Sequence, residues 1–259
     1  MSSSSPAPGA LAAPADVPSR PASEPPVPAP ASPTAPGAPS APVGPVRRVA
    51  GTAGAALLAL AVLLGLQLRL HDGAPVALDL GASTWAASVR AAAPWTETVA
   101  LWLNWVGGGF VAIWVVPAAI LVGLLLARRW RGAVTSAVAL IVSAGAVQLV
   151  KNSFDRVRPE TTLVTSDHGS FPSGHTANAA TLAVLAVVLV PPAWRRWTAL
   201  VGALWVVVMA TSRLILSIHW ATDLVGGAFA GLGAALVVVA LLPAGRRIRL
   251  PPPGSPGGR

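Results

Sequence analysis

The amino-acid sequence predicts an all-α, polytopic membrane protein with six transmembrane helices and both termini in the cytoplasm. The first observation behind this prediction is composition: 54% of the 259 residues are hydrophobic and only 10% are charged, which is too apolar for a soluble globular domain. The second is that charge-free runs long enough to cross a hydrocarbon core of about 30 Å, at about 1.5 Å per residue, recur along the chain. The third is the placement of arginine, which distinguishes the two sides of the membrane.

The net charge of +9 would favour nucleic-acid binding only if basic residues clustered on a polar surface among aromatic side chains. The arginines instead form small groups between the apolar runs, so we expect no nucleic-acid partner. The chain contains no cysteine, which excludes a disulfide framework and a thiolate metal site.

The composition divides the chain into three parts. Residues 1–46 are mostly Pro, Ala, Ser and Gly, with almost no large apolar side chain to offset the entropy of ordering, so we expect a disordered cytoplasmic tail. This tail is not expected to be a signal peptide, because it has no apolar region near its start. Residues 47–245 form the predicted membrane domain, and residues 246–259 form a second disordered tail.

Six apolar runs are the predicted transmembrane helices. Pro117 lies inside the second and is expected to kink it, and Pro191 and Pro192 end the fourth, because proline lacks the N–H that a helix interior needs. The six spans cover residues 49–68, 99–127, 132–150, 176–190, 197–214 and 224–242. Between the first two spans we expect a structural helix on the outer membrane interface, with an apolar stripe made by Leu78, Ala82, Trp85 and Val89.

The distribution of basic residues orients the spans, because short arginine-rich loops remain in the cytoplasm. With the N-terminus inside, twelve of the eighteen basic residues lie in inner segments and six in outer ones, whereas seven of the nine acidic residues lie outside. Both termini are therefore predicted to be cytoplasmic. The outer basic residues include Lys151, the only lysine in the chain.

Three polar clusters lie on the predicted outer face. They are KNSFDRVRP at residues 151–159, FPSGH at residues 171–175 and SRLILSIHWATD at residues 212–223. Each cluster adjoins a helix end on the same side of the membrane. Because helix connections are short, we expect the three clusters to converge on one site.

Lys151, Arg158 and Arg213 would give this site three cationic groups. The two guanidinium groups match phosphate oxygens bidentately, which favours an anionic ligand with several oxygens. Ser173 and Gly174 begin the fourth span, where a helix N-terminus presents free N–H groups and a positive dipole to a phosphate. We therefore predict a phosphate site formed by these five residues.

Two histidines complete the predicted site, since histidine exchanges protons near neutrality with an ordinary pKa of about 6.5. Asp223 follows His219 by four residues, so in a helical segment its carboxylate would bind one ring N–H and leave the other nitrogen free to attack. His175 is then free to protonate the leaving oxygen as general acid. The other outer carboxylates match no metal-ligand spacing, so we expect neither a metal nor another cofactor.

The motifs K-x6-RP at residues 151–159, PSGH at residues 172–175 and SR-x5-H-x3-D at residues 212–223 resemble the signature of the type 2 phosphatidic acid phosphatase superfamily. In that family the second-motif histidine is the general acid and the third-motif histidine becomes a phosphohistidine, which implies these roles for His175 and His219. The resemblance also implies catalysis without a metal, and phosphate binding by Lys151, Arg158, Ser173, Gly174 and Arg213.

The resemblance implies an integral plasma-membrane phosphatase that hydrolyses a lipid phosphate or pyrophosphate on the extracytoplasmic side of the bilayer. Phosphatidic acid, phosphatidylglycerol phosphate and polyprenyl pyrophosphate all present a terminal phosphate, and the sequence does not discriminate among them. Two alternatives stay open: a phosphotransferase that passes the phosphate to an alcohol, and a non-enzymatic lipid carrier or flippase. The sequence gives no indication of the oligomeric state.

Overall fold

The computed structural model describes residues 44–165 and 169–242, all of which belong to one unit of the chain, Pro42–Arg259. These residues form helices joined by turns and loops, with no strand among them, so the predicted all-α fold class is confirmed. The predicted tails lie outside the described residues, except for positions 44–46. There, Pro45 and Val46 already belong to the first helix.

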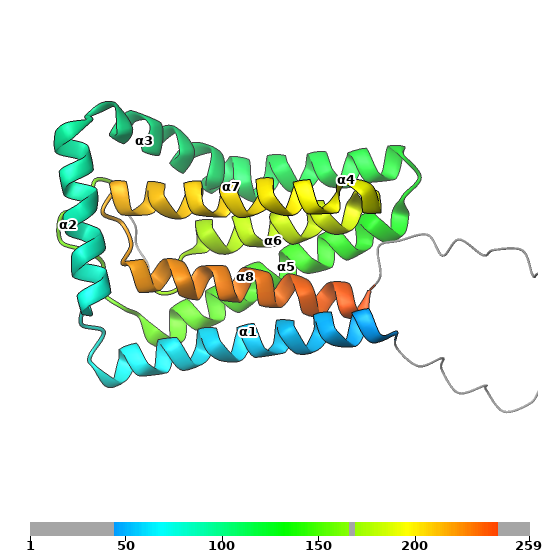
Figure 1. Ribbon diagram of the computed structural model, residues 1–259, viewed down its shortest axis with the longest axis horizontal. Helices are drawn as coiled ribbons and strands as arrows, with labels where there is room; N and C mark the ends of the chain where they lie inside the picture. The colour runs from blue at the N-terminus through cyan, green and yellow to red at the C-terminus, as the bar shows by residue number, and fades with distance from the viewer. Residues whose placement is uncertain (1–43, 166–168, 243–259) are drawn as a thin grey trace, which may run out of the picture. The chain divides into compact units, whose positions relative to one another are not determined.

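Eight α-helices and two short helical turns make up the described residues. Figure 1 shows α1 and α4 to α8 running in a common direction, with α2 crossing the ends of α7 and α8. In chain order the elements are α1 (Pro45–Leu70), α2 (Ala77–Ala92), α3 (Trp95–Gly107), the π-helical turn η1 (Val111–Val115), α4 (Val116–Leu126), α5 (Trp130–Phe154), α6 (Gly174–Leu189), the 3-10 turn η2 (Pro192–Trp194), α7 (Arg195–Ile215) and α8 (Ala221–Leu241).

The central helix is α8, which packs against α1, α5 and α6, while α6 also packs against α7. Its sequence explains this position, because glycine and alanine recur along the helix and let neighbouring backbones approach closely. A Cβ atom at Gly231 would overlap the backbone of Ala177 in α6, and one at Gly233 would come within 2.8 Å of Gly54 O in α1. Over half of its most apolar 18-residue window, 56%, is therefore buried inside the protein.

Four helices are long and apolar enough to cross a membrane, namely Pro45–Leu70, Trp130–Phe154, Pro192–Ile215 and Ala221–Leu241. The pair Trp95–Gly107 and Val111–Leu126, bent by 41°, supplies a fifth crossing if it is one broken span. The remaining predicted span, the fourth at residues 176–190, corresponds to α6, which has only 16 residues. Four to five candidate spans are thus found, and the prediction of six spans with cytoplasmic termini stays a prediction.

The second predicted span is broken at a different residue from the one expected. Pro117 was expected to produce the kink, but the chain leaves helical geometry at Gly108 and Gly109, between α3 and η1. Pro117 is the second residue of α4, which continues directly from the π-helical turn η1, so the hydrogen-bond pattern changes just before the proline but the helix is not broken there. The glycines, and not the proline, therefore set the bend.

A buried extended segment precedes α6. Residues 169–173 have no helical structure and are all buried, and α6 begins directly after them at Gly174. Non-helical backbone at membrane depth is tolerated only where protein covers it, and this segment is covered. The N-terminus of α6 therefore lies inside the protein, next to the ends of α5, α7 and α8.

The helix predicted between the first two spans is present as α2, and part of its expected apolar stripe is turned outward, whereas Val89 packs against the core. Leu78 and Trp85 are exposed, whereas the buried positions on α2 are Asp79 and Ala86. A fully buried aspartate on a surface helix needs a partner, because an unpaired charge away from water is costly. The partner belongs to the candidate active site.

Candidate active site

Four helix ends bring the predicted site residues together. Lys151 lies in the last turn of α5 and Arg158 in the loop that follows, while Arg213 lies near the end of α7. His219 is in the loop between α7 and α8. A cavity of about 180 Å³ opens among them, and its walls are Gln148, Lys151, Arg158, Gly174, His175, Arg213, Ile218 and His219.

The three predicted cations all reach this cavity and are held by carbonyl groups. Lys151 Nζ donates a hydrogen bond of 2.6 Å to Gly169 O, and Arg158 Nη1 donates one of 2.6 Å to Ile218 O. Burial lowers the pKa of Arg158, and the Asp223 carboxylate partly opposes that effect. Like charges gathered in a partly buried cavity repel one another, so an anion between them is the natural counter-charge.

Arg213 is the most constrained of the three. It is fully buried, and its Nη1 donates a hydrogen bond of 2.7 Å to Asn104 Oδ1. Its Nη2 is also buried and has no hydrogen-bond partner within the described residues. A buried guanidinium nitrogen without an acceptor is destabilising, and a bound oxyanion would supply that acceptor.

His219 faces Asp223 across a non-helical loop. Its Nδ1 lies 3.4 Å from Asp223 Oδ2, and its Nε2 lies 3.4 Å from Arg158 Nη1. The helical segment on which the i, i+4 argument was conditional does not span both residues, because α8 begins only at Ala221. Asp223 instead caps that helix by accepting a 2.8 Å hydrogen bond from Trp220 N, which holds its carboxylate near the histidine.

The environment of His219 keeps its imidazole neutral. Burial lowers its pKa to about 4, despite the opposing effect of the Asp223 carboxylate. The ring nitrogen that does not face Asp223, Nε2, is therefore unprotonated at neutral pH when Nδ1 holds the proton, and its lone pair faces the cavity beside Arg158. Such a nitrogen can attack an electrophilic phosphorus.

His175 lines the same cavity from the first turn of α6. Its Nε2 lies 3.4 Å from the backbone oxygen of Asn104 in α3. Gly108 packs so closely that a Cβ atom there would overlap His175 Nε2. The lack of a side chain at Gly108 thus allows the broken span to contact the histidine.

Ser173 and Asp223 lie behind the cavity wall. Ser173 is fully buried; its N–H donates a 2.9 Å hydrogen bond to Asp223 O, and its hydroxyl accepts one of 3.2 Å from Thr176. Its side chain makes no capping hydrogen bond to α6, although it occupies the N-cap position. Gly174, in contrast, lines the cavity. Phosphate binding by Ser173 stays a prediction.

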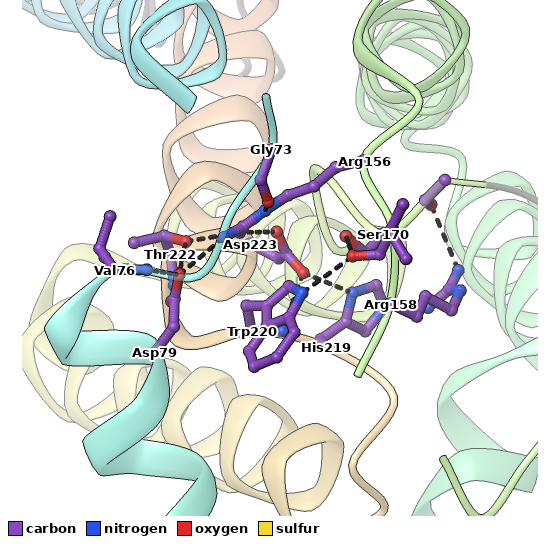
Figure 2. Close-up of polar contacts among 12 residues, drawn as sticks. Gly73, Val76, Asp79, Arg156, Arg158, Ser170, His219, Trp220, Thr222 and Asp223 are labelled. Carbon is purple, nitrogen blue, oxygen red and sulfur yellow. Dashed lines mark hydrogen bonds and ion pairs between the residues drawn. The ribbon is translucent and has the colours of Figure 1, made fainter. Parts of the chain in front are cut away.

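Sequence reasoning missed a buried network behind His219 (Figure 2). Arg156 Nη1 donates a 2.7 Å hydrogen bond to Asp223 Oδ1, and Arg156 Nη2 donates one of 2.7 Å to Asp79 Oδ2. Arg156 is also held by Gly73 O, through a 3.0 Å bond from Nε. The available signal was Asp79 itself, a lone carboxylate close to the start of an amphipathic helix.

Asn104 and Gln148 also belong to the site, although neither lies in the three motifs. Asn104 orients Arg213 through its side chain and lies against His175 through its backbone oxygen. Gln148 stands one helical turn before Lys151 and contributes to the cavity wall. A polar residue one turn from a predicted ligand-binding residue on the same helix face was the signal available for Gln148.

Parts of this chain are similar in sequence to known proteins. Phosphatidylglycerophosphatase B of Escherichia coli (strain K12) is 46% identical over 56 residues, which is 22% of this chain and 22% of that protein. The chain therefore matches only about a fifth of the length of this curated relative.

Solved structures match a larger share of this chain. The first transmembrane PAP2 type phosphatidylglycerolphosphate phosphatase from Bacillus subtilis superposes with a TM-score of 0.64 at 25% identity, over 76% of this chain and 98% of that one. Aquifex aeolicus LpxE superposes with a TM-score of 0.54 at 21% identity, over 63% of this chain and 96% of that one, which shows a shared fold.

The apolar helices and these membrane neighbours together make the chain an integral membrane protein. Its sequence matches the PAP2 superfamily over residues 132–247, a range that contains all three polar motifs and the helices α5 to α8 that carry them. Residues 132–247 are thus a domain of the PAP2 superfamily, the family of type 2 phosphatidic acid phosphatases that the motifs resemble.

Proposed function

We propose that this protein is a membrane phosphatase that hydrolyses a lipid phosphate or pyrophosphate through a phosphohistidine on His219. The observation that carries the proposal is one cavity lined by three cationic side chains and two histidines. Such a cavity suits a phosphate group that must be bound, attacked and released. Membership of the PAP2 superfamily and the phosphatase relatives support the same activity.

An apolar groove beside the cavity supports a lipid substrate. The groove has a volume of about 530 Å³ and shares Gln148, Lys151, Gly174 and His175 with the polar cavity. Its other walls come from α5, α6 and the broken span, and include Ile113, Trp114, Leu121, Leu140, Ile141 and Val147. A ligand that fills both spaces has a phosphate at one end and a hydrocarbon chain at the other, as the lipid phosphates do.

In the proposed reaction, His219 Nε2 attacks phosphorus while Asp223 holds the Nδ1 proton. The bond between phosphorus and the leaving oxygen breaks, and His175 gives that oxygen a proton. Water then attacks the phosphohistidine with His175 as base, which breaks the P–N bond and releases inorganic phosphate. Lys151, Arg158 and Arg213 stabilise the charge that develops on the phosphoryl oxygens. None of these steps involves a metal.

The arginine distribution places the active site on the extracytoplasmic side in this proposal. The helix ends that carry the cavity are those predicted to face outward, and they lie together at the end of the bundle crossed by α2 (Figure 1). The substrate phosphate would then be met at the outer leaflet, while its tail stays in the bilayer.

Phosphate release by the purified protein in detergent tests the proposal. The substrates are phosphatidic acid, phosphatidylglycerol phosphate and a polyprenyl pyrophosphate, each with and without excess EDTA. We expect release from at least one lipid, unchanged by EDTA and abolished by His219→Ala. His71→Ala is the matched control, because His71 is an exposed residue at the end of α1. Activity that survives in His219→Ala would overturn the histidine mechanism, and loss in EDTA that Mg²⁺ restores would overturn metal independence.

A further inference from the structure

The helix α2 makes buried polar contacts that its amphipathic sequence does not explain. Asp79 is fully buried and accepts hydrogen bonds from Thr222 N at 2.8 Å and Thr222 Oγ1 at 2.9 Å, in addition to the ion pair with Arg156. Four hydrogen-bond donor groups thus converge on one carboxylate, since Val76 N also donates to Asp79 Oδ2 at 3.1 Å. A carboxylate so fully satisfied is held in one position.

The contacts of Asp79 lead directly to His219 (Figure 2). Arg156 joins the Asp79 and Asp223 carboxylates through two 2.7 Å ion pairs, and Asp223 Oδ2 faces His219 Nδ1 at 3.4 Å. The side chains of both Arg156 and Asp223 are almost completely inaccessible to solvent. Because these side chains are buried and bonded to one another, a displacement of Asp79 would shift Arg156. Through Arg156 it would also shift the Asp223 carboxylate that orients the imidazole.

The C-terminal part of α2 holds the other end of the same loop. Arg90 Nη1 donates hydrogen bonds of 2.6 Å to Ile215 O and 3.0 Å to Ser217 Oγ. Ser217 has a φ of +51°, a left-handed conformation that is unfavourable for serine unless its surroundings impose it. The two charged residues of α2, Asp79 and Arg90, thus hydrogen-bond to the segment of residues 215–223 on both sides of His219.

We propose that α2 is a clamp that positions the nucleophile loop, with Asp79 and Arg90 as its two positioning residues. The proposal rests on the proposed function, in which His219 attacks phosphorus. Neither residue lines the phosphate cavity, so neither is expected to touch the substrate. Their role is to remove conformational freedom from the non-helical residues 216–220. They act in addition to the loop after α5, which hydrogen-bonds to Leu216, Ile218 and Trp220.

This role predicts a specific kinetic signature. A nucleophile held away from in-line geometry reacts more slowly, whereas the cations that bind the phosphate stay in place. We expect Asp79→Asn to lower kcat on the order of 100-fold and Arg90→Met to lower it about tenfold, with KM within about twofold of the parent value. Arg90→Lys should recover most of the loss, because a lysine can still donate to Ile215 O.

The control is Asp72→Asn, which removes a carboxylate from the exposed turn between α1 and α2 and should change neither parameter. All variants are measured as full chains in detergent, on the lipid phosphate that the parent protein hydrolyses, with gel filtration to confirm folding. A kcat within twofold of the parent for both Asp79→Asn and Arg90→Met, while His219→Ala is inactive, would overturn the clamp and leave the proposed function intact. If Asp79→Asn does not fold, Arg90→Met and Arg90→Lys decide the question.

Hydrogen exchange supplies a readout that does not depend on activity. Amides in residues 215–223 should exchange at least about tenfold faster in Asp79→Asn and Arg90→Met than in Asp72→Asn, while the interior of α8 exchanges as before. Unchanged exchange in this loop would overturn the clamp even if the protein releases no phosphate from any lipid. The failure of the clamp and the failure of the proposed function are thus separable.

Discussion

His219 is surrounded by groups that act on its imidazole in opposite directions. Asp223 lies beside Nδ1, whereas Arg158, Lys151 and His175 lie on the cavity side. Burial outweighs the attraction of the carboxylate and lowers the pKa of His219 to about 4. A nucleophilic imidazole must be neutral, and a pKa of about 4 leaves His219 neutral near pH 7.

The first prediction concerns the titration of His219. Because its pKa is depressed, the neutral form present above pH 6.5 should persist as the pH falls, until protonation sets in near pH 4. The measurement is NMR on protein with ¹⁵N-labelled histidine, with His219→Ala used to assign the signal. We expect the ring to remain unprotonated from pH 8 down to about pH 5. A midpoint close to the ordinary value of about 6.5 would show that the imidazole is not held in a desolvated environment.

At the scale of elements, the break between α3 and η1 shapes the wall around His175. Gly108 has an extended backbone that any residue can adopt, with φ of −139° and ψ of −177°. Glycine is therefore required at this position for close approach to His175 and not for an unusual backbone conformation. The shape of the apolar groove and the position of His175, the proposed general acid, both depend on this contact.

The second prediction is that Gly108→Ala lowers phosphate release on the order of 100-fold, because its Cβ atom displaces His175 from the cavity. The matched control is Gly123→Ala in α4, where an added Cβ meets nothing within 4 Å. We expect the control to retain full activity and both variants to fold, as checked by thermal unfolding in detergent. Equal activities for the two variants would mean that His175 does not need its present position.

Local sequence could predict some of these elements and not others. The three motifs identified the cavity-lining residues Lys151, Arg158, Gly174, His175, Arg213 and His219, because each motif is a short segment at a helix end. Asp79, Arg90 and Asn104 come from α2 and α3, far from the motifs in sequence, so tertiary packing is needed to connect them with the site. The bend was misplaced because the helix is not broken at Pro117, where α4 continues directly from the π-helical turn η1.

For the whole molecule, the helix content and the apolar surface can be predicted from the composition. The number of membrane crossings cannot. The helix α6 has 16 residues, about 24 Å at 1.5 Å per residue, so it is shorter than the hydrocarbon core of about 30 Å. A buried extended segment, residues 169–173, precedes it. A hydropathy pattern locates the apolar helix but does not show whether the polar segment before it is buried in the protein or exposed at its surface.

The third prediction concerns the orientation of the chain in the membrane. The chain has no cysteine, so single cysteines can be introduced without background. Thr161→Cys, in the exposed loop after α5, should react with a membrane-impermeant maleimide in intact cells, because it lies on the predicted outer side. Ala193→Cys, in the exposed connection between α6 and α7, should react only after the membrane is opened. The reverse pattern would place the cavity on the cytoplasmic side.

The central claim, that phosphate passes through His219, is tested most directly by trapping the intermediate. Purified protein is mixed with a ³²P-labelled lipid phosphate, quenched within milliseconds in alkali, and examined for label on the chain, because a phosphohistidine survives alkali and is lost in acid. We predict up to one acid-labile label per chain in the parent protein and none in His219→Ala, with His71→Ala labelled like the parent. Turnover without any labelled chain, or label that persists in His219→Ala, would contradict the account.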